Sequence, residues 1–178
     1  MKKRLLLLTG NPGVGKTTVL LKTVENLKDK GYSIGGMLSR EVREGGTRVG
    51  FEILDLRSSE RGWLAHANQE GGPRVGKYRV NLENLNSIGA EAIIAAVEKC
   101  DVIAIDEIGP MELFSEKFKQ AVKKAVESGK HVIAVVHWKA KDRLIEEVKK
   151  RGDTEMYVVS YENRGNLHEV IAKKLLDA

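Results

Sequence analysis

A glycine-rich stretch near the start of the chain has the spacing of a phosphate-binding loop. Residues 10–17, GNPGVGKT, match the pattern GxxxxGK[ST] at every position. Glycines let the backbone curl so that successive N–H groups converge on an anion. Lys16 would place a cation on the β- and γ-phosphates of a nucleotide, and the Thr17 hydroxyl would be a Mg²⁺ ligand. Thr18, in the first turn of the following helix, could contact the α-phosphate.

Two adjacent acids supply a second chemical feature. Asp106 and Glu107 follow the apolar run 102–105 in the segment CDVIAIDEIGPMELF. An aspartate in this position is the expected partner of Mg²⁺ in P-loop enzymes. A neighbouring glutamate can orient and deprotonate water, which favours hydrolysis over phosphoryl transfer to another acceptor. A structural or substrate-binding role is the alternative for Glu107, and Glu112 is a rival base that could equally be an ordinary residue at the start of a helix.

Several other side chains could contact a nucleotide, although solvated loop positions are the plainer interpretation. His137 ends the apolar run 132–136 and could sense the γ-phosphate. Trp138, Lys139 and Lys141 follow it and could cover the nucleotide. The candidates for a charge-neutralising arginine are Arg40, Arg43, Arg48, Arg61 and Arg164.

Short apolar runs alternate with helical patterns along the chain. The expected strands are 4–8, 34–40, 48–56, 102–105, 132–136 and 155–159, with weaker candidates at 62–66 and 77–80. The expected helices are 16–30, 88–99, 115–128, 142–151 and 167–176. This alternation predicts an α/β fold with a mainly parallel sheet flanked by helices. Gly45–Gly46 predicts an antiparallel hairpin insert between the second and third strands.

Composition limits the class of protein. The 178 residues are 42% hydrophobic and 31% charged, without a break or repeat, so we expect a single domain covering 1–178. No apolar run approaches the ~20 residues of a membrane span, and the run after Met1–Arg4 is too short for a signal peptide. We therefore expect a cytoplasmic protein. As a separate expectation, the protein is a monomer. Lys and Glu dominate the charged residues, as in thermophile proteins.

The net charge and the single cysteine narrow the possible partners. A charge of +5 permits a nucleic-acid partner, but only 5% of residues are aromatic and a polyphosphate site explains the charge equally well. One cysteine excludes an intramolecular disulfide. The chain has no [NT]KxD run to read guanine, so we expect poor base selectivity.

The whole chain resembles the THEP1 family of P-loop nucleoside-triphosphatases, relatives of a human cancer-related nucleoside-triphosphatase. The resemblance rests on TGNPGVGKTT, GGMLSREVREGGTRVGFEILDL, RGWLAHA, VGKYRVNLENL, AIDEIGPMELFS and ENRGNL. It implies a variant of the RecA-type core and slow, Mg²⁺-dependent hydrolysis of ATP, GTP, CTP and UTP to diphosphate and phosphate. Family members often carry lysine after DEIG, where this chain has Pro110, so any help of that lysine with phosphate must come from elsewhere here.

The resemblance and the motifs together assign the expected site. The nucleotide-binding residues are Gly10, Asn11, Pro12, Gly13, Val14, Gly15, Lys16, Thr17, Thr18, Val102, Ile103, Ala104, Ile105, Asp106, Glu107, Ile108 and Gly109. Thr17 and Asp106 are the expected Mg²⁺ ligands, and Glu107 and Lys16 are the expected catalytic residues.

Two other functions remain open. A phosphotransferase would use the same loop and pass phosphate to a nucleotide, nucleoside or other small alcohol, with an acceptor site formed by 34–56 and 61–77. A nucleotide-dependent switch would instead control a protein or RNA partner, and RNA binding would weaken steeply with salt.

Overall fold

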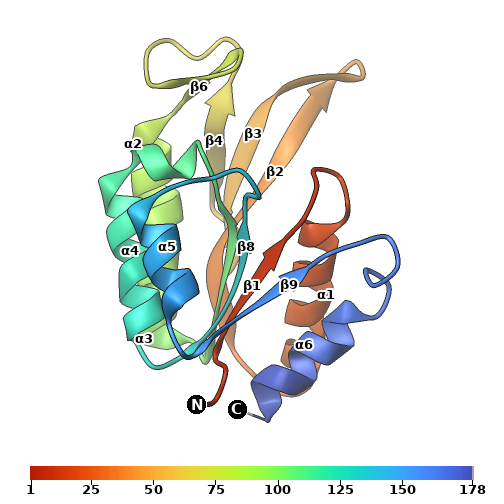
Figure 1. Cartoon of the computed structure of the whole chain (residues 1–178). Coiled ribbons are helices and arrows are strands. Elements are labelled where there is room, and N and C mark those ends of the chain that lie inside the picture. The colour runs from red at the N-terminus through yellow and green to blue at the C-terminus, as the bar shows by residue number, and fades with distance from the viewer. Residues whose placement is uncertain (178) are drawn as a thin grey trace.

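Five parallel strands form one side of the sheet in the computed structural model, which describes residues 1–177 (Figure 1). Their order across the sheet is β2-β7-β8-β1-β9, so that β8 lies between the strand before the glycine-rich loop and the strand with the paired acids. Their bounds are β1 Leu5–Thr9, β2 Ile34–Glu44, β7 Val102–Ile108, β8 His131–Val136 and β9 Thr154–Val158. The predicted parallel sheet is confirmed.

Helices cover both faces of this sheet, and the leucines of β1 show why. Leu5 and Leu7 point into the core under α3, α4 and α5, whereas Leu6 and Leu8 point into the core under α1 and α6 (Figure 1). All four are essentially inaccessible to solvent. A strand buried on both faces needs this unbroken apolar run. The helices are α1 Lys16–Asp29, α3 Glu91–Lys99, α4 Glu116–Glu127, α5 Arg143–Lys150 and α6 Leu167–Leu176.

The helical segment before β7 begins earlier than the sequence predicted. It starts with α2, Leu82–Asn84, continues through a π-helical stretch, Leu85–Ala90, and then joins α3. Asn81 caps it, because its side-chain oxygen accepts a hydrogen bond from the Asn84 N–H at 2.9 Å. The sequence pattern placed the start at Ile88, since the apolar periodicity of a straight α-helix is broken by the π-helical turn. Over residues 1–177, the helices are all too short or too polar to cross a membrane.

The predicted hairpin is confirmed, and the antiparallel part of the sheet extends well beyond it. Gly45 and Gly46 make the turn with φ of +57° and +80°. Three further strands continue the sheet beyond β3, in the order β4, β6 and β5. Their bounds are β3 Thr47–Asp55, β4 Arg61–His66, β5 Arg74–Val75 and β6 Tyr78–Val80. Strands β3, β4, β5 and β6 are called the antiparallel extension below. They rise beside the loop that follows β1 (Figure 1).

Gly36 joins the two parts of the sheet, and we expect Gly36→Ala to destabilise the protein. Its φ is +129°, and a Cβ there would lie 1.9 Å from the carbonyl oxygen of Ala104 on β7. Backbone strain and the clash together should lower the free energy of unfolding by about 2–4 kcal/mol in urea denaturation. Gly165→Ala is the matched control, because no atom lies within 4 Å of its Cβ position. Equal stability of the two variants would contradict this account of Gly36.

Candidate nucleotide site

The glycine-rich loop leaves the carboxyl end of β1 and leads directly into α1. Gly10, Gly13 and Gly15 have φ of +146°, +76° and +111°, values that favour glycine strongly. A Cβ on Gly10 would lie 2.8 Å from the carbonyl oxygen of Val159. Gly15 is the N-cap of α1, so the free N–H groups and the positive end of the helix dipole meet at the loop. The backbone therefore has the form that an anion such as a phosphate requires.

Thr17 and Asp106 meet although 89 residues separate them in the chain. The Thr17 hydroxyl donates a hydrogen bond of 2.6 Å to Oδ2 of Asp106, whose side chain is 3% exposed. The sequence placed Asp106 directly after a strand ending at Ile105, but β7 continues to Ile108. It does so because β2 and β8 flank it on both sides, pairing Asp106 with Leu38 and Val135. The acids thus lie in the last part of the strand, a correction to the predicted boundary.

Burial gives both acids unusual proton affinities. The pKa of Asp106 is raised to about 7, chiefly by burial and also by the Glu107 carboxylate, against the opposing effects of the Thr17 hydrogen bond and Lys16. Burial also raises the pKa of Glu107, opposed by Lys16. A raised pKa brings a carboxylate closer to the neutral range in which a general base works best.

Lys16 is the cation that faces these groups. Its ammonium donates a hydrogen bond of 2.8 Å to the Gly10 carbonyl oxygen and is partly buried in the loop. Lys16 also acts on the pKa values of Asp106, Glu107 and His137, so its charge lies close to all three side chains. The loop, the lysine and the two acids therefore form one site at the carboxyl end of the sheet.

The oxygen atoms of Thr17 and Asp106 fit Mg²⁺. This ion binds proteins through one or two oxygen ligands and completes its octahedron with water and substrate phosphates. Residues 1–177 contain no cluster of three or more His, Cys, Asp or Glu side chains arranged to hold a metal ion. A cation held jointly by the protein and a triphosphate suits this donor set better than one held by protein groups alone.

A sequence model of a family described as NTPase matches residues 5–172 of the chain. The nucleoside-triphosphatase THEP1 of Thermofilum pendens is 45% identical over 176 residues, which cover 98% of this chain and 97% of the relative. THEP1 of Methanocaldococcus jannaschii is 43% identical over 173 residues, 96% of either chain. The chain belongs to the THEP1 family. It is thus a nucleoside-triphosphatase.

Two solved structures share the fold. The crystal structure of THEP1 from Aquifex aeolicus superposes with a TM-score of 0.85 at 29% identity, covering 96% of this chain and 98% of the other. The solution structure of a human cancer-related nucleoside triphosphatase gives 0.83 at 35% identity and covers 98% of both chains. The P-loop nucleoside-triphosphatase fold predicted from the sequence is therefore confirmed.

Among the five candidate arginines, Arg164 is the one that lies at the phosphate-binding loop. Its Cδ is 3.5 Å from the Cβ position of Gly15, and its guanidinium lies 4.9 Å from the centre of the Tyr161 ring. A hollow of about 180 Å³ opens there beside Thr18. The remaining four lie away from the loop, two on β2, one on β3 and one on β4, and bind side chains of β2, β3 and β6; they are Arg40, Arg43, Arg48 and Arg61.

His137 lies beside Glu107, as the strand order predicted. Its backbone N–H donates to the Ile108 carbonyl oxygen at 3.1 Å, and the residue lines a cavity together with Glu107 and Glu112. Burial, Lys16 and Lys139 lower the pKa of His137, which favours the neutral ring at pH 7. Trp138 is 46% exposed and pairs with the Lys139 ammonium, 4.7 Å from the ring centre.

Glu112 differs most from its sequence-based interpretation. It does begin a short 3₁₀ helix, Glu112–Phe114, but its side chain is only 2% exposed. A Cβ on Gly109 would lie 3.0 Å from Oε1 of Glu107 and 3.2 Å from Oε2 of Glu112. Both carboxyl groups thus lie against the Gly109 backbone, and burial followed by repulsion from Glu107 raises the pKa of Glu112 well above its usual range.

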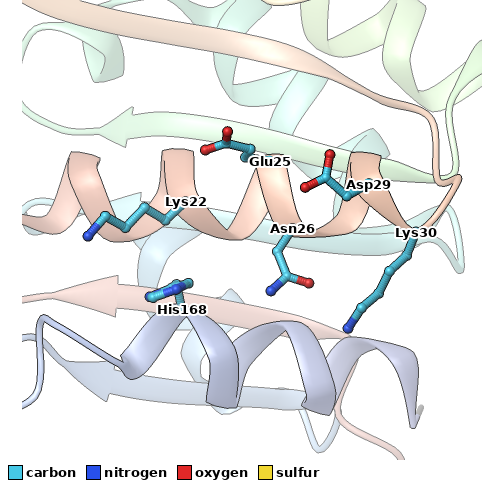
Figure 2. Close-up of a pocket in the computed structure, with 6 residues that line it drawn as sticks. All are labelled: Lys22, Glu25, Asn26, Asp29, Lys30 and His168. Carbon is cyan, nitrogen blue, oxygen red and sulfur yellow. The ribbon is translucent and has the colours of Figure 1, made fainter.

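A larger hollow, about 460 Å³, lies between α1 and α6 and away from the paired acids. Figure 2 shows Asn26 on α1 and His168 on α6 pointing into the gap between the two helices. Charges of both signs surround it, from Lys22, Glu25, Asp29 and Lys30. Neither Asp106 nor Glu107 lines it, so it is not the site of the triphosphate chemistry.

Proposed function

We propose that this nucleoside-triphosphatase hydrolyses ATP, GTP, CTP and UTP with Mg²⁺, slowly and with little base selectivity. The observation that carries the proposal is the 2.6 Å contact between Thr17 of the loop and Asp106 of β7. That contact joins the phosphate-binding loop to the strand of Glu107, so a water beside Glu107 would face the end of a triphosphate held in the loop.

Each residue then has a distinct task. Lys16 and the N-terminus of α1 hold the β- and γ-phosphates, while Thr17 and Asp106 hold the metal ion. Mg²⁺, when bound, would neutralise the charge that develops on these phosphates. Glu107 takes a proton from water as the water oxygen attacks the γ-phosphorus.

The surroundings of the loop support poor base selectivity. The hollow beside Thr18 is bordered by Arg164, which stacks on Tyr161. Flat groups of this kind contact the face of a base, and stacking accepts any base because each has a π-face. With no guanine-reading motif in the sequence, we expect all four nucleotides to be accepted.

We expect slow turnover because of where the candidate arginines lie. Four of the five candidate arginines bind side chains of β2, β3 and β6, and Arg164 lies beside Gly15 and Tyr161 rather than at the cavity that Glu107 lines. An arginine that stabilises the transferring phosphoryl group is worth about 10³–10⁵ in rate. Without one, the isolated enzyme should be slow.

The test is phosphate release from purified protein with each of the four nucleoside triphosphates, with and without Mg²⁺. We expect release from all four at rates within about tenfold of one another, since tenfold corresponds to one modest contact of ~1.4 kcal/mol. Chelation of the metal with EDTA should abolish it. Release from a single nucleotide, or release independent of Mg²⁺, would contradict the proposal.

Replacing the loop lysine should weaken both binding and turnover. We expect Lys16→Ala to lower phosphate release at least about 10²-fold, because a charge aimed at the transferring group is lost. Lys28→Ala, at the other end of the same helix and exposed, is the matched control. Wild-type rates in Lys16→Ala would show that the loop does not hold the triphosphate.

A further inference from the structure

A cavity of about 130 Å³ lies beside Glu107 and is lined by residues other than those of the loop. Its polar lining consists of Ser39, Glu107, Glu112 and His137. A cavity of ~150 Å³ accommodates benzene, so this one can hold a molecule of similar size. Because Glu107 lines it, a ligand inside would lie next to the proposed base of the hydrolytic reaction.

The packing of the protein does not explain why the carboxyl group of Glu112 is buried without a full set of hydrogen-bond partners. Its carboxyl group is buried, and Oε2 has no hydrogen-bond partner among the described residues. An unsatisfied buried polar group costs about 1–3 kcal/mol, so folded proteins rarely keep one without a use. Glu112 therefore offers a hydrogen-bonding group to whatever enters the cavity.

The antiparallel extension supplies the apolar wall. Phe51 of β3, Leu64 of β4 and Val75 of β5 line the cavity opposite the acids. Phe51 packs edge-on against Tyr78 with ring centres 5.4 Å apart, and Arg48 lies over both rings, which fixes this wall in place. Neither the phosphate loop nor the Thr17–Asp106 contact uses these strands, so the extension has a separate task.

We propose that this cavity binds a small uncharged alcohol, which accepts the γ-phosphoryl group in place of water. The hydrogen-bonding side chains would hold the hydroxyl and the apolar wall would hold the carbon chain. The alcohol oxygen forms a bond to the γ-phosphorus, the bond from that phosphorus to the β–γ bridging oxygen breaks, and the hydroxyl proton passes to Glu107. The products are a nucleoside diphosphate and a phosphate monoester. The proposal rests on the proposed function, since it uses the same loop and base.

The test compares diphosphate formed with inorganic phosphate released, using ATP, Mg²⁺ and each of 1-butanol, 1,4-butanediol and glycerol. The diol's isomer 1,2-dimethoxyethane contains the same atoms without a hydroxyl and is the chemical control. With an alcohol, we expect the ratio of ADP to phosphate to rise from unity to about 2 or more, because a bound acceptor has a high effective concentration. The excess should appear as a phosphate monoester in the ³¹P spectrum.

Two variants test whether the excess of ADP over phosphate arises from an alcohol bound in this cavity. Val75→Phe enlarges a half-buried edge-strand residue into the cavity and should return the ratio to unity, whereas the exposed Val170→Phe should not. Glu112→Leu removes the unpaired carboxyl and serves as a second test if Val75→Phe fails to fold; it too should abolish the excess. An excess that persists in both variants would overturn the assignment to this cavity.

The outcomes separate this proposal from the hydrolytic one. Equal ADP and phosphate with all three alcohols, with phosphate still released in their absence, overturns the acceptor site alone. Formation of ADP only when an alcohol is present supports the acceptor site and overturns hydrolysis as the main activity.

Discussion

Glu107→Gln is expected to bind nucleoside triphosphates as the wild type does and to release phosphate about 10²–10⁴-fold more slowly, the usual contribution of a general base. Glutamine keeps the shape of the side chain and removes its ability to take a proton. Nucleotide affinity should change little, because the loop and Lys16 hold the phosphates. Equilibrium titration with ATP and single-turnover phosphate release measure the two effects separately.

The exposed Glu127→Gln is the matched control for this variant and should behave as the wild type. If Glu107→Gln hydrolyses ATP at the wild-type rate, the base has been misassigned. Glu112, whose carboxyl lies against the same glycine, is then the next residue to replace.

Asp106→Asn should stabilise the metal-free protein at high pH while abolishing Mg²⁺-dependent hydrolysis. The folded protein keeps the Asp106 proton up to a pKa of about 7, whereas an unfolded chain loses it near the ordinary aspartate pKa of 3.8. Between these values the unfolded state binds fewer protons, so the free energy of unfolding falls as pH rises, by up to about 4 kcal/mol from this one group. Asparagine carries no proton to lose and removes that part of the pH dependence.

Urea denaturation at pH 5 and pH 8 in EDTA measures this difference. As pH rises, the free energy of unfolding of Asp106→Asn should increase relative to that of the wild type. The exposed Asp29→Asn should show the same pH dependence as the wild type. Parallel pH dependence of Asp106→Asn and wild type would mean that Asp106 is ionised in the folded metal-free protein.

The parts of the site that the sequence predicted are those fixed by local order along the chain. Eight consecutive residues define the loop, and the β-strand before it and the helix after it follow from adjacent patterns. Asp106 and Glu107 could be placed because they end an apolar run, although the length of β7 depends on pairing with β2 and β8.

The remaining features arise from contacts between distant segments. Arg164 lies at the loop although 150 residues separate it from Val14, and no local pattern distinguishes it from four other arginines. Strand β5 has two residues, too few for a periodic signal. Glu112 lines a cavity together with residues of β3, β4 and β5, which are distant in the chain. The one signal of its burial in the sequence is its position between Met111 and Leu113 in an apolar run.

Hydrolysis of ATP with Mg²⁺ in water enriched in oxygen-18 tests the central claim most directly. If Glu107 activates water against the γ-phosphorus of a triphosphate held by the loop, the released phosphate carries oxygen-18 and ADP carries none. Oxygen-18 in ADP, or no phosphate release at all, would contradict the account.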